Sequence, residues 1–222
     1  VRELAGWVGA LAVAVIVVAQ VASTARSEIL FRDGDSLVVP LLARSILEGD
    51  QLDWALSSVL FLPETAVFTL LRVALPWGVE ALLVVNAVIN LVALYGGFRL
   101  AAGRRRPGSA PVLWSLLALA AFGALAMTET SASRDSVELA SLLLTTTYYS
   151  ATVIAVVVTV GLARRLCDRP TSDRSLVLLI TLGLVATVST LSNPLYAAWA
   201  TVPLAVVLGI AALRIPARRR ML

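Results

Sequence analysis

Apolar residues occur in six long runs that are separated by polar segments. A helix needs about 20 apolar residues to cross the roughly 30 Å hydrocarbon core of a bilayer. Each run has close to that length, and the two shortest can be extended by one turn through Thr and Ser at their ends. The runs are 4–22, 79–100, 112–127, 142–162, 176–191 and 195–213. This pattern predicts an all-α polytopic membrane helix bundle with about six spans, forming a single transmembrane domain over residues 1–222.

The segment between the first two runs, residues 23–78, contains two shorter amphipathic stretches. Residues 37–48 place apolar side chains on one helical face and end before Gly49. Residues 63–75 begin with a proline and a glutamate, which are typical of a first helical turn. A helix of that length extends only about 20 Å. We therefore expect two juxtamembrane helices that lie along the outer membrane surface, or dip into it, without crossing.

The composition excludes several classes of protein. The chain is 59% hydrophobic and 14% charged, whereas soluble domains are about half apolar and a quarter charged. One Cys and no His exclude an intrachain disulfide and the usual transition-metal sites. All 18 basic residues are Arg, which excludes Schiff-base and P-loop chemistry because both need Lys. The abundance of Arg, Ala, Val and Leu is typical of a GC-rich genome.

The distribution of arginines predicts an orientation in the membrane. If the N-terminus is cytoplasmic, 13 of the 18 arginines fall on the inner side with three acids, and 11 acids fall outside. This follows the positive-inside rule. We expect a multi-pass protein of the bacterial plasma membrane, with both termini cytoplasmic and lipids as its surroundings. Topology explains the basic pI, so no nucleic-acid partner is expected. Cleavage of the first run as a signal peptide is the alternative for residues 1–22.

The sharpest candidate chemistry is the acidic turn formed by Asp33 and Asp35 around Gly34. Two carboxylates so placed can converge on one acceptor hydroxyl or one divalent cation, and an oxygen-only pair suits Mg²⁺ or Mn²⁺. The alternative is an exposed turn that caps the following helix.

Further polar side chains collect at the predicted outer ends of the spans. Tyr148 and Tyr149 belong to the hydroxyl-rich start of the fourth run, and Asn193 follows the fifth. They could line an outward-facing substrate pocket or only hydrogen-bond neighbouring helices. Arg72 and Arg134 are candidates to bind a lipid phosphate, since the guanidinium matches phosphate geometry. The alternatives are a snorkelling side chain and a solvated loop.

Asn86 and Asn90 lie four residues apart in the second run, and therefore on one helical face. We expect them to hydrogen-bond between helices, with contact to a ligand as the alternative.

Four short segments, together with the order of the elements, carry a resemblance to a known family. The segments are 31–36, 53–55, 61–64 and 192–195. The arrangement resembles GT-C-type membrane glycosyltransferases, as a short or divergent member. The resemblance implies that Asp33 or Asp35 acts as base or metal ligand, and that a polyprenyl-phosphate sugar is the donor. Related proteins often have an acid where Asn193 stands. The chain would then be a glycosyltransferase module working on the outer face.

The alternative function is a non-catalytic integral membrane subunit or scaffold of a larger complex. Its outer loop would then be a docking surface for a membrane protein partner. The modest number of catalytic groups in the chain is compatible with this hypothesis.

Overall fold

The structure is a computed structural model that describes residues 2–50, 53–104, 106–133, 140–168 and 174–219. All regular secondary structure among these residues is helical, which confirms the predicted fold class. Short π-helical segments, η1 (Glu28–Arg32) and η3 (Ala197–Thr201), and the 3₁₀ segment η2 (Ser141–Leu144) join longer helices. The α-helices are α1 (Arg2–Ala22), α2 (Gly34–Glu48), α3 (Leu62–Ala74), α4 (Val79–Ala101), α5 (Pro111–Thr128), α6 (Ser150–Asp168), α7 (Arg174–Ser192) and α8 (Val202–Arg219).

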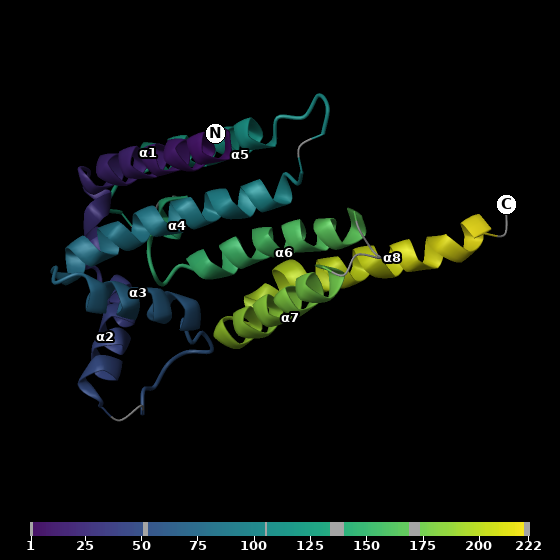
Figure 1. Ribbon diagram of the computed structural model, residues 1–222. Helices are drawn as coiled ribbons and strands as arrows, with labels where there is room; N and C mark the ends of the chain where they lie inside the picture. The colour runs from purple at the N-terminus through teal and green to yellow at the C-terminus, as the bar shows by residue number, and fades with distance from the viewer. Residues whose placement is uncertain (1, 51–52, 105, 134–139, 169–173, 220–222) are drawn as a thin grey trace.

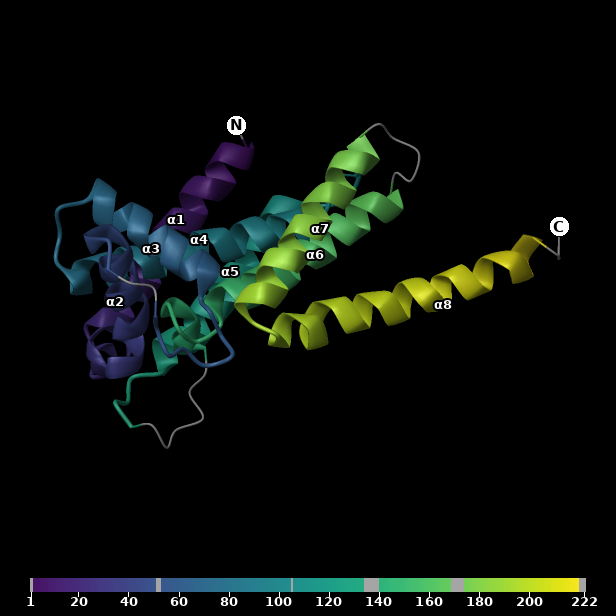
Figure 2. The ribbon, with the colours of Figure 1, turned by 90° about the horizontal axis from the view of Figure 1, so that it is seen from below.

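Five helices are long and apolar enough to cross a membrane: α1, α4, α5, α6 and α7. Helix α1 packs against α4 and α5, α4 also packs against α6, and α6 packs against α7 (Figure 1). The chain is therefore a multi-pass helical membrane bundle. The sixth predicted run is helical as η3 and α8, but its apolar helix, Ala197–Ala211, is shorter than the others. Helix α8 extends away from the bundle (Figure 2).

The fourth predicted span begins later than expected. We predicted 142–162, but α6 starts at Ser150 and continues to Asp168. Tyr149 has a φ of 63°, a left-handed conformation that an α-helix cannot accommodate. Thr145 Oγ1 also donates to the Leu142 carbonyl at 2.8 Å, a local bond that competes with helix formation. Residues 145–149 consequently form an irregular segment before α6.

Two short helices occur in the first loop, as predicted, but α2 begins at Gly34, three residues before the expected start at residue 37. Gly34 and Asp35 therefore belong to the first turn of α2. Helices α2 and α3 pack against each other at one end of the bundle, beside the start of α4 (Figure 1). Gly49 ends α2 with a φ of 74°, a conformation that glycine adopts without strain. Their lengths of 15 and 13 residues are below those of the five candidate spans.

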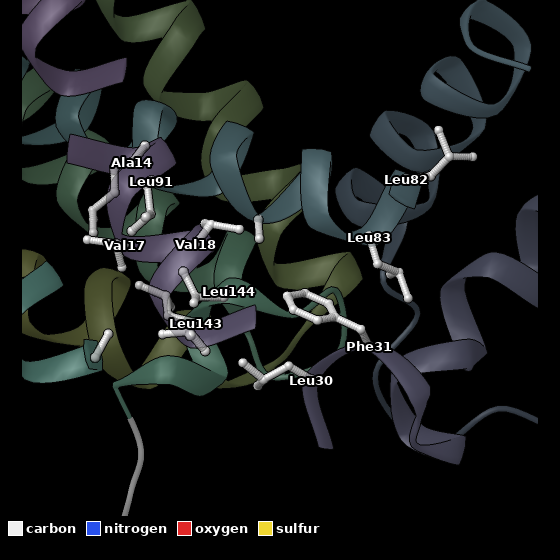
Figure 3. Close-up of a cluster of buried hydrophobic side chains, with 14 of the residues drawn as sticks. Ala14, Val17, Val18, Leu30, Phe31, Leu82, Leu83, Leu91, Leu143 and Leu144 are labelled. Carbon is white, nitrogen blue, oxygen red and sulfur yellow. The ribbon is translucent and has the colours of Figure 1, made fainter. Parts of the chain in front are cut away.

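The hydrophobic core extends into this same end of the molecule. It joins α1, represented by Val17 and Val18, to Phe31 of η1, Leu91 of α4 and Leu144 of η2 (Figure 3). The segments flanking the acidic turn and those preceding α6 are therefore anchored to the spanning helices by buried apolar contacts.

Candidate functional site

The acidic turn lies at the start of α2. Asp33 is the N-cap residue in an extended conformation, without a side-chain capping bond, and Asp35 lies in the first turn. The Asp35 carboxylate accepts a hydrogen bond from the Tyr148 hydroxyl at 3.1 Å. Thr146 Oγ1 lies 3.5 Å from the Ser36 carbonyl oxygen. The structure thus joins the acidic turn to the hydroxyl-rich segment that precedes α6.

The carboxylate oxygens at this turn provide only part of the ligand set that a divalent cation needs. Asp35 is exposed and Asp33 is half-buried. The nearby acids Glu28 and Glu80 are both paired with Arg32, at 2.6 and 2.8 Å. No group of three or more His, Cys, Asp or Glu suited to a metal occurs among the described residues. A Mg²⁺ ion here would depend on Asp33, Asp35, water and a substrate phosphate.

Tyr149 and Asn193 have roles within the fold. The Tyr149 ring packs edge-to-face on Trp199, with ring centroids 6.3 Å apart. Asn193 is 1% exposed; its amide nitrogen donates to Thr152 Oγ1 at 3.1 Å, and its oxygen accepts the Leu195 N–H at 3.0 Å. Asn193 therefore ties the turn after α7 to α6.

Of the two candidate phosphate-binding arginines, the structure describes Arg72. Arg72 donates to the Trp77 carbonyl at 2.8 Å. It also lines a cavity of about 600 Å³ between α2 and α3, with Arg44 and Glu48 opposite. Arg134 lies outside the described residues.

A buried polar network joins the end of α5 to η2 and to Arg26, and the sequence did not predict it. Glu129, at the end of α5, accepts the backbone N–H groups of Ala140 and Ser141 at 2.8 and 2.6 Å. Arg26 donates to Ser141 Oγ at 2.9 Å. These bonds fix η2, and hence residues 145–149, relative to the end of α1.

Two of the segments that carried the family resemblance lie side by side. The Ser192 carbonyl accepts the Leu60 N–H at 2.8 Å, and Ser192 Oγ accepts the Leu62 N–H at 3.0 Å. These two hydrogen bonds therefore hold the start of α3 against the end of α7. No periodicity in the sequence predicts this contact, because it joins residues 130 positions apart.

A second polar feature is Glu64, which the sequence predicts at a helix start and which belongs to the segment 61–64 of the family resemblance. In the structure its side chain is 6% exposed, and burial raises its pKa above the ordinary carboxyl value. One carboxylate oxygen accepts the Ala151 N–H at 3.3 Å, and the other has no hydrogen-bond partner among the residues that the structure describes. Glu64 borders a cavity that Asn86 and Asn90 also line. The four-residue spacing of these asparagines was the one sequence signal for this site.

Comparison with protein-family profiles, curated proteins and solved structures gives no match for this chain.

Proposed function

We propose that the chain is a GT-C-like membrane glycosyltransferase module that transfers a sugar from a lipid-phosphate carrier. The reaction would take place at the end of the bundle that holds α2 and α3, on the outer face of the bacterial plasma membrane. The observation that most supports this is the hydrogen bond between Asp35 and Tyr148. It links an exposed acidic turn to a tyrosine in the irregular segment that precedes α6, where a membrane-borne donor and a water-borne acceptor can meet.

The proposed step is a displacement at the anomeric carbon of a polyprenyl-phosphate sugar. The acceptor hydroxyl oxygen forms a bond to that carbon, the bond from carbon to phosphate oxygen breaks, and polyprenyl phosphate leaves. Asp35 or Asp33 takes the acceptor's proton as general base. A divalent cation, if bound at these carboxylates, would offset the charge that develops on the leaving phosphate.

The other predicted residues have supporting roles in this proposal. Tyr148 orients the Asp35 carboxylate through its hydrogen bond. Arg72 and Arg134 are proposed to contact the carrier phosphate. Tyr149 and Asn193 shape the wall of the site from the segments before α6 and after α7.

The proposal can be tested in proteoliposomes that contain a panel of polyprenyl-phosphate sugars. Release of polyprenyl phosphate is measured for the unmodified chain and for Asp33→Asn and Asp35→Asn. Loss of a general base should lower the rate by a factor of about 100 or more. Asp50→Asn is the matched control, because it makes the same change at an exposed position of the same loop. Carrier release that is unchanged in both Asp33→Asn and Asp35→Asn would contradict the proposal.

A non-catalytic subunit is the second candidate function, and helix α8 is the observation that favours it. Within the described residues α8 packs mainly on η3, and it stands apart from the other helices (Figure 2). Its apolar side chains, including Val202, Val206 and Ile210, are exposed. A protein partner could cover this face. Purification as a stoichiometric complex that Val206→Asn dissociates, together with no carrier release from any donor, would support this function instead.

A further inference from the structure

A second cavity, of about 440 Å³, lies between α4, α6 and α7 and is covered at one end by α3. Helices α4 and α7 each pack against α6, and contacts between α4 and α7 are few in the described part of the chain. Three small lining residues, Ala93, Ala151 and Ala155, leave space where longer side chains would fill it. The volume lies within the usual range of small-molecule sites, about 300–1,000 Å³.

The cavity is polar only near α3. Glu64 enters from α3, with Asn86 of α4 and Ser189 of α7 also in the lining. Asn90 is committed to the irregular segment, since its amide nitrogen lies 3.3 Å from the Thr145 carbonyl. The remaining lining is largely apolar: Val67, Ile89, Ile154, Val158, Leu184, Val185 and Val188.

The described residues that line this cavity include no arginine. Among them the free carboxylate oxygen of Glu64 therefore has no charged partner. An ionised carboxylate buried without a counter-charge is costly, so burial at this position favours the protonated acid. A protonated carboxyl presents one donor and one acceptor, and an occupant with a hydroxyl group can satisfy both.

We propose that this cavity binds a neutral single-chain amphiphile whose head is a hydroxyl group, such as a long-chain alcohol. Glu64 exchanges hydrogen bonds with the hydroxyl, and the hydrocarbon chain lies along the apolar walls of α4, α6 and α7. An anionic lipid is disfavoured, because the lining offers a carboxyl group and no arginine to its phosphate. Entry is from the bilayer, past Leu184 and Val188, which are 61% and 44% exposed.

This site is distinct from the acidic turn and does not depend on the proposed transferase activity. Its residues come from α3, α4, α6 and α7, whereas the acidic turn belongs to α2 and contacts Tyr148.

The test uses the full chain in detergent micelles with hexadecanol that carries a photoreactive diazirine in its chain. Mass spectrometry locates the crosslinks, and unlabelled hexadecanol competes for the site. We expect saturable labelling of α4, α6 or α7 residues that line the cavity. Glu64→Gln retains a neutral donor and acceptor and should retain binding within about threefold. Glu64→Leu removes them and should weaken binding by about tenfold, the equivalent of about 1.4 kcal/mol.

A second variant tests the cavity itself. Ala155→Phe fills the space and should abolish saturable labelling. Ala12→Phe, at an exposed position of α1, is the matched control. The proposal would be overturned in favour of a cation site by two results together. Glu64→Gln would lose binding, and hexadecylamine would displace the probe better than hexadecanol does. Competition by palmitate equal to that by hexadecanol, or labelling unchanged by Ala155→Phe, would overturn it as well.

Discussion

Glu64 and Asp35 both lie in the first turn of a short helix, yet their carboxylates are in opposite environments. Asp35 is exposed and bonded to a tyrosine hydroxyl, whereas Glu64 is buried beside a largely apolar cavity. The difference arises because other segments of the chain pack against the start of α3 and cover Glu64, whereas Asp35 is not covered in this way. Contacts with Ala151 and with the end of α7 bury Glu64 at the start of α3, and they join residues far apart in the chain. Local sequence patterns therefore predicted the acidic turn but could not predict the buried acid.

Burial of Glu64 predicts a pH dependence of stability. Its folded-state pKa is raised above the ordinary value of 4.5, so the folded protein holds this proton more tightly than the unfolded chain. The stabilisation is fully present below the ordinary pKa and is lost as pH rises through the elevated pKa. Thermal unfolding in detergent, measured across this range, should show a decline that is absent in Glu64→Gln. Identical dependence of unfolding temperature on pH in the unmodified chain and in Glu64→Gln would contradict this prediction.

Asn193 should contribute to stability through its two buried hydrogen bonds. Asn193→Ala leaves Thr152 Oγ1 and the Leu195 N–H without these partners, at an expected cost of about 1–3 kcal/mol. Thermal or denaturant unfolding measures the loss. Thr187→Ala, at an exposed position of α7, is the control and should change stability by less than about 0.5 kcal/mol. Equal effects of the two substitutions would show that the Asn193 bonds contribute little.

At the scale of elements, hydropathy predicted the five helices that are long and apolar enough to cross a membrane. The sixth predicted run, 195–213, is not among them in the described part of the chain, because its apolar helix is shorter. Hydropathy did not predict the start of α6, where Tyr149 adopts a left-handed conformation and threonines bond locally. It also did not reveal which small residues set helix contacts. A Cβ on Gly97 of α4 would come within 3.1 Å of the Val157 side chain of α6. Gly161 is the tighter position, and nothing in the local sequence distinguished it.

The pair Gly161 and Gly183 provides a direct test of packing between α4 and α6. A Cβ on Gly161 would lie 2.9 Å from the backbone of Leu100 and Ala101, and backbone cannot move aside cheaply. Gly161→Ala should therefore destabilise the bundle by about 1–3 kcal/mol. Gly183 has nothing within 4 Å, so Gly183→Ala should be neutral or stabilise α7 by up to about 1 kcal/mol. The free energy of unfolding in detergent is measured for both variants. Equal effects of the two substitutions would contradict the close packing of α4 and α6 at Gly161.

At the scale of the whole molecule, the bundle places α2, α3 and the acidic turn together at one end. The arginine distribution predicts that this end faces outward, and this orientation stays a prediction. The native Cys167 lies at the end of α6, on the expected inner side, and is exposed.

Orientation can be tested by labelling intact cells with a membrane-impermeant maleimide. Cys167 should remain unlabelled, because it faces the cytoplasm in the predicted topology. Ser58→Cys, placed in the first loop of a Cys167→Ser protein, should be labelled, since residue 58 is exposed. Labelling after the cells are permeabilised confirms that Cys167 is reactive. The reverse pattern would place the acidic turn in the cytoplasm.

We propose that Asp35 and Tyr148 act together in sugar transfer from a lipid-phosphate carrier. The most direct measurement is a double-mutant cycle on carrier release in proteoliposomes, with Asp35→Asn, Tyr148→Phe and the double variant. Because Tyr148 acts through the carboxylate, we expect Tyr148→Phe to slow release in the native chain and to add almost nothing once Asp35 is Asn. Rates that multiply independently, or release unaffected by Asp35→Asn, would contradict the account.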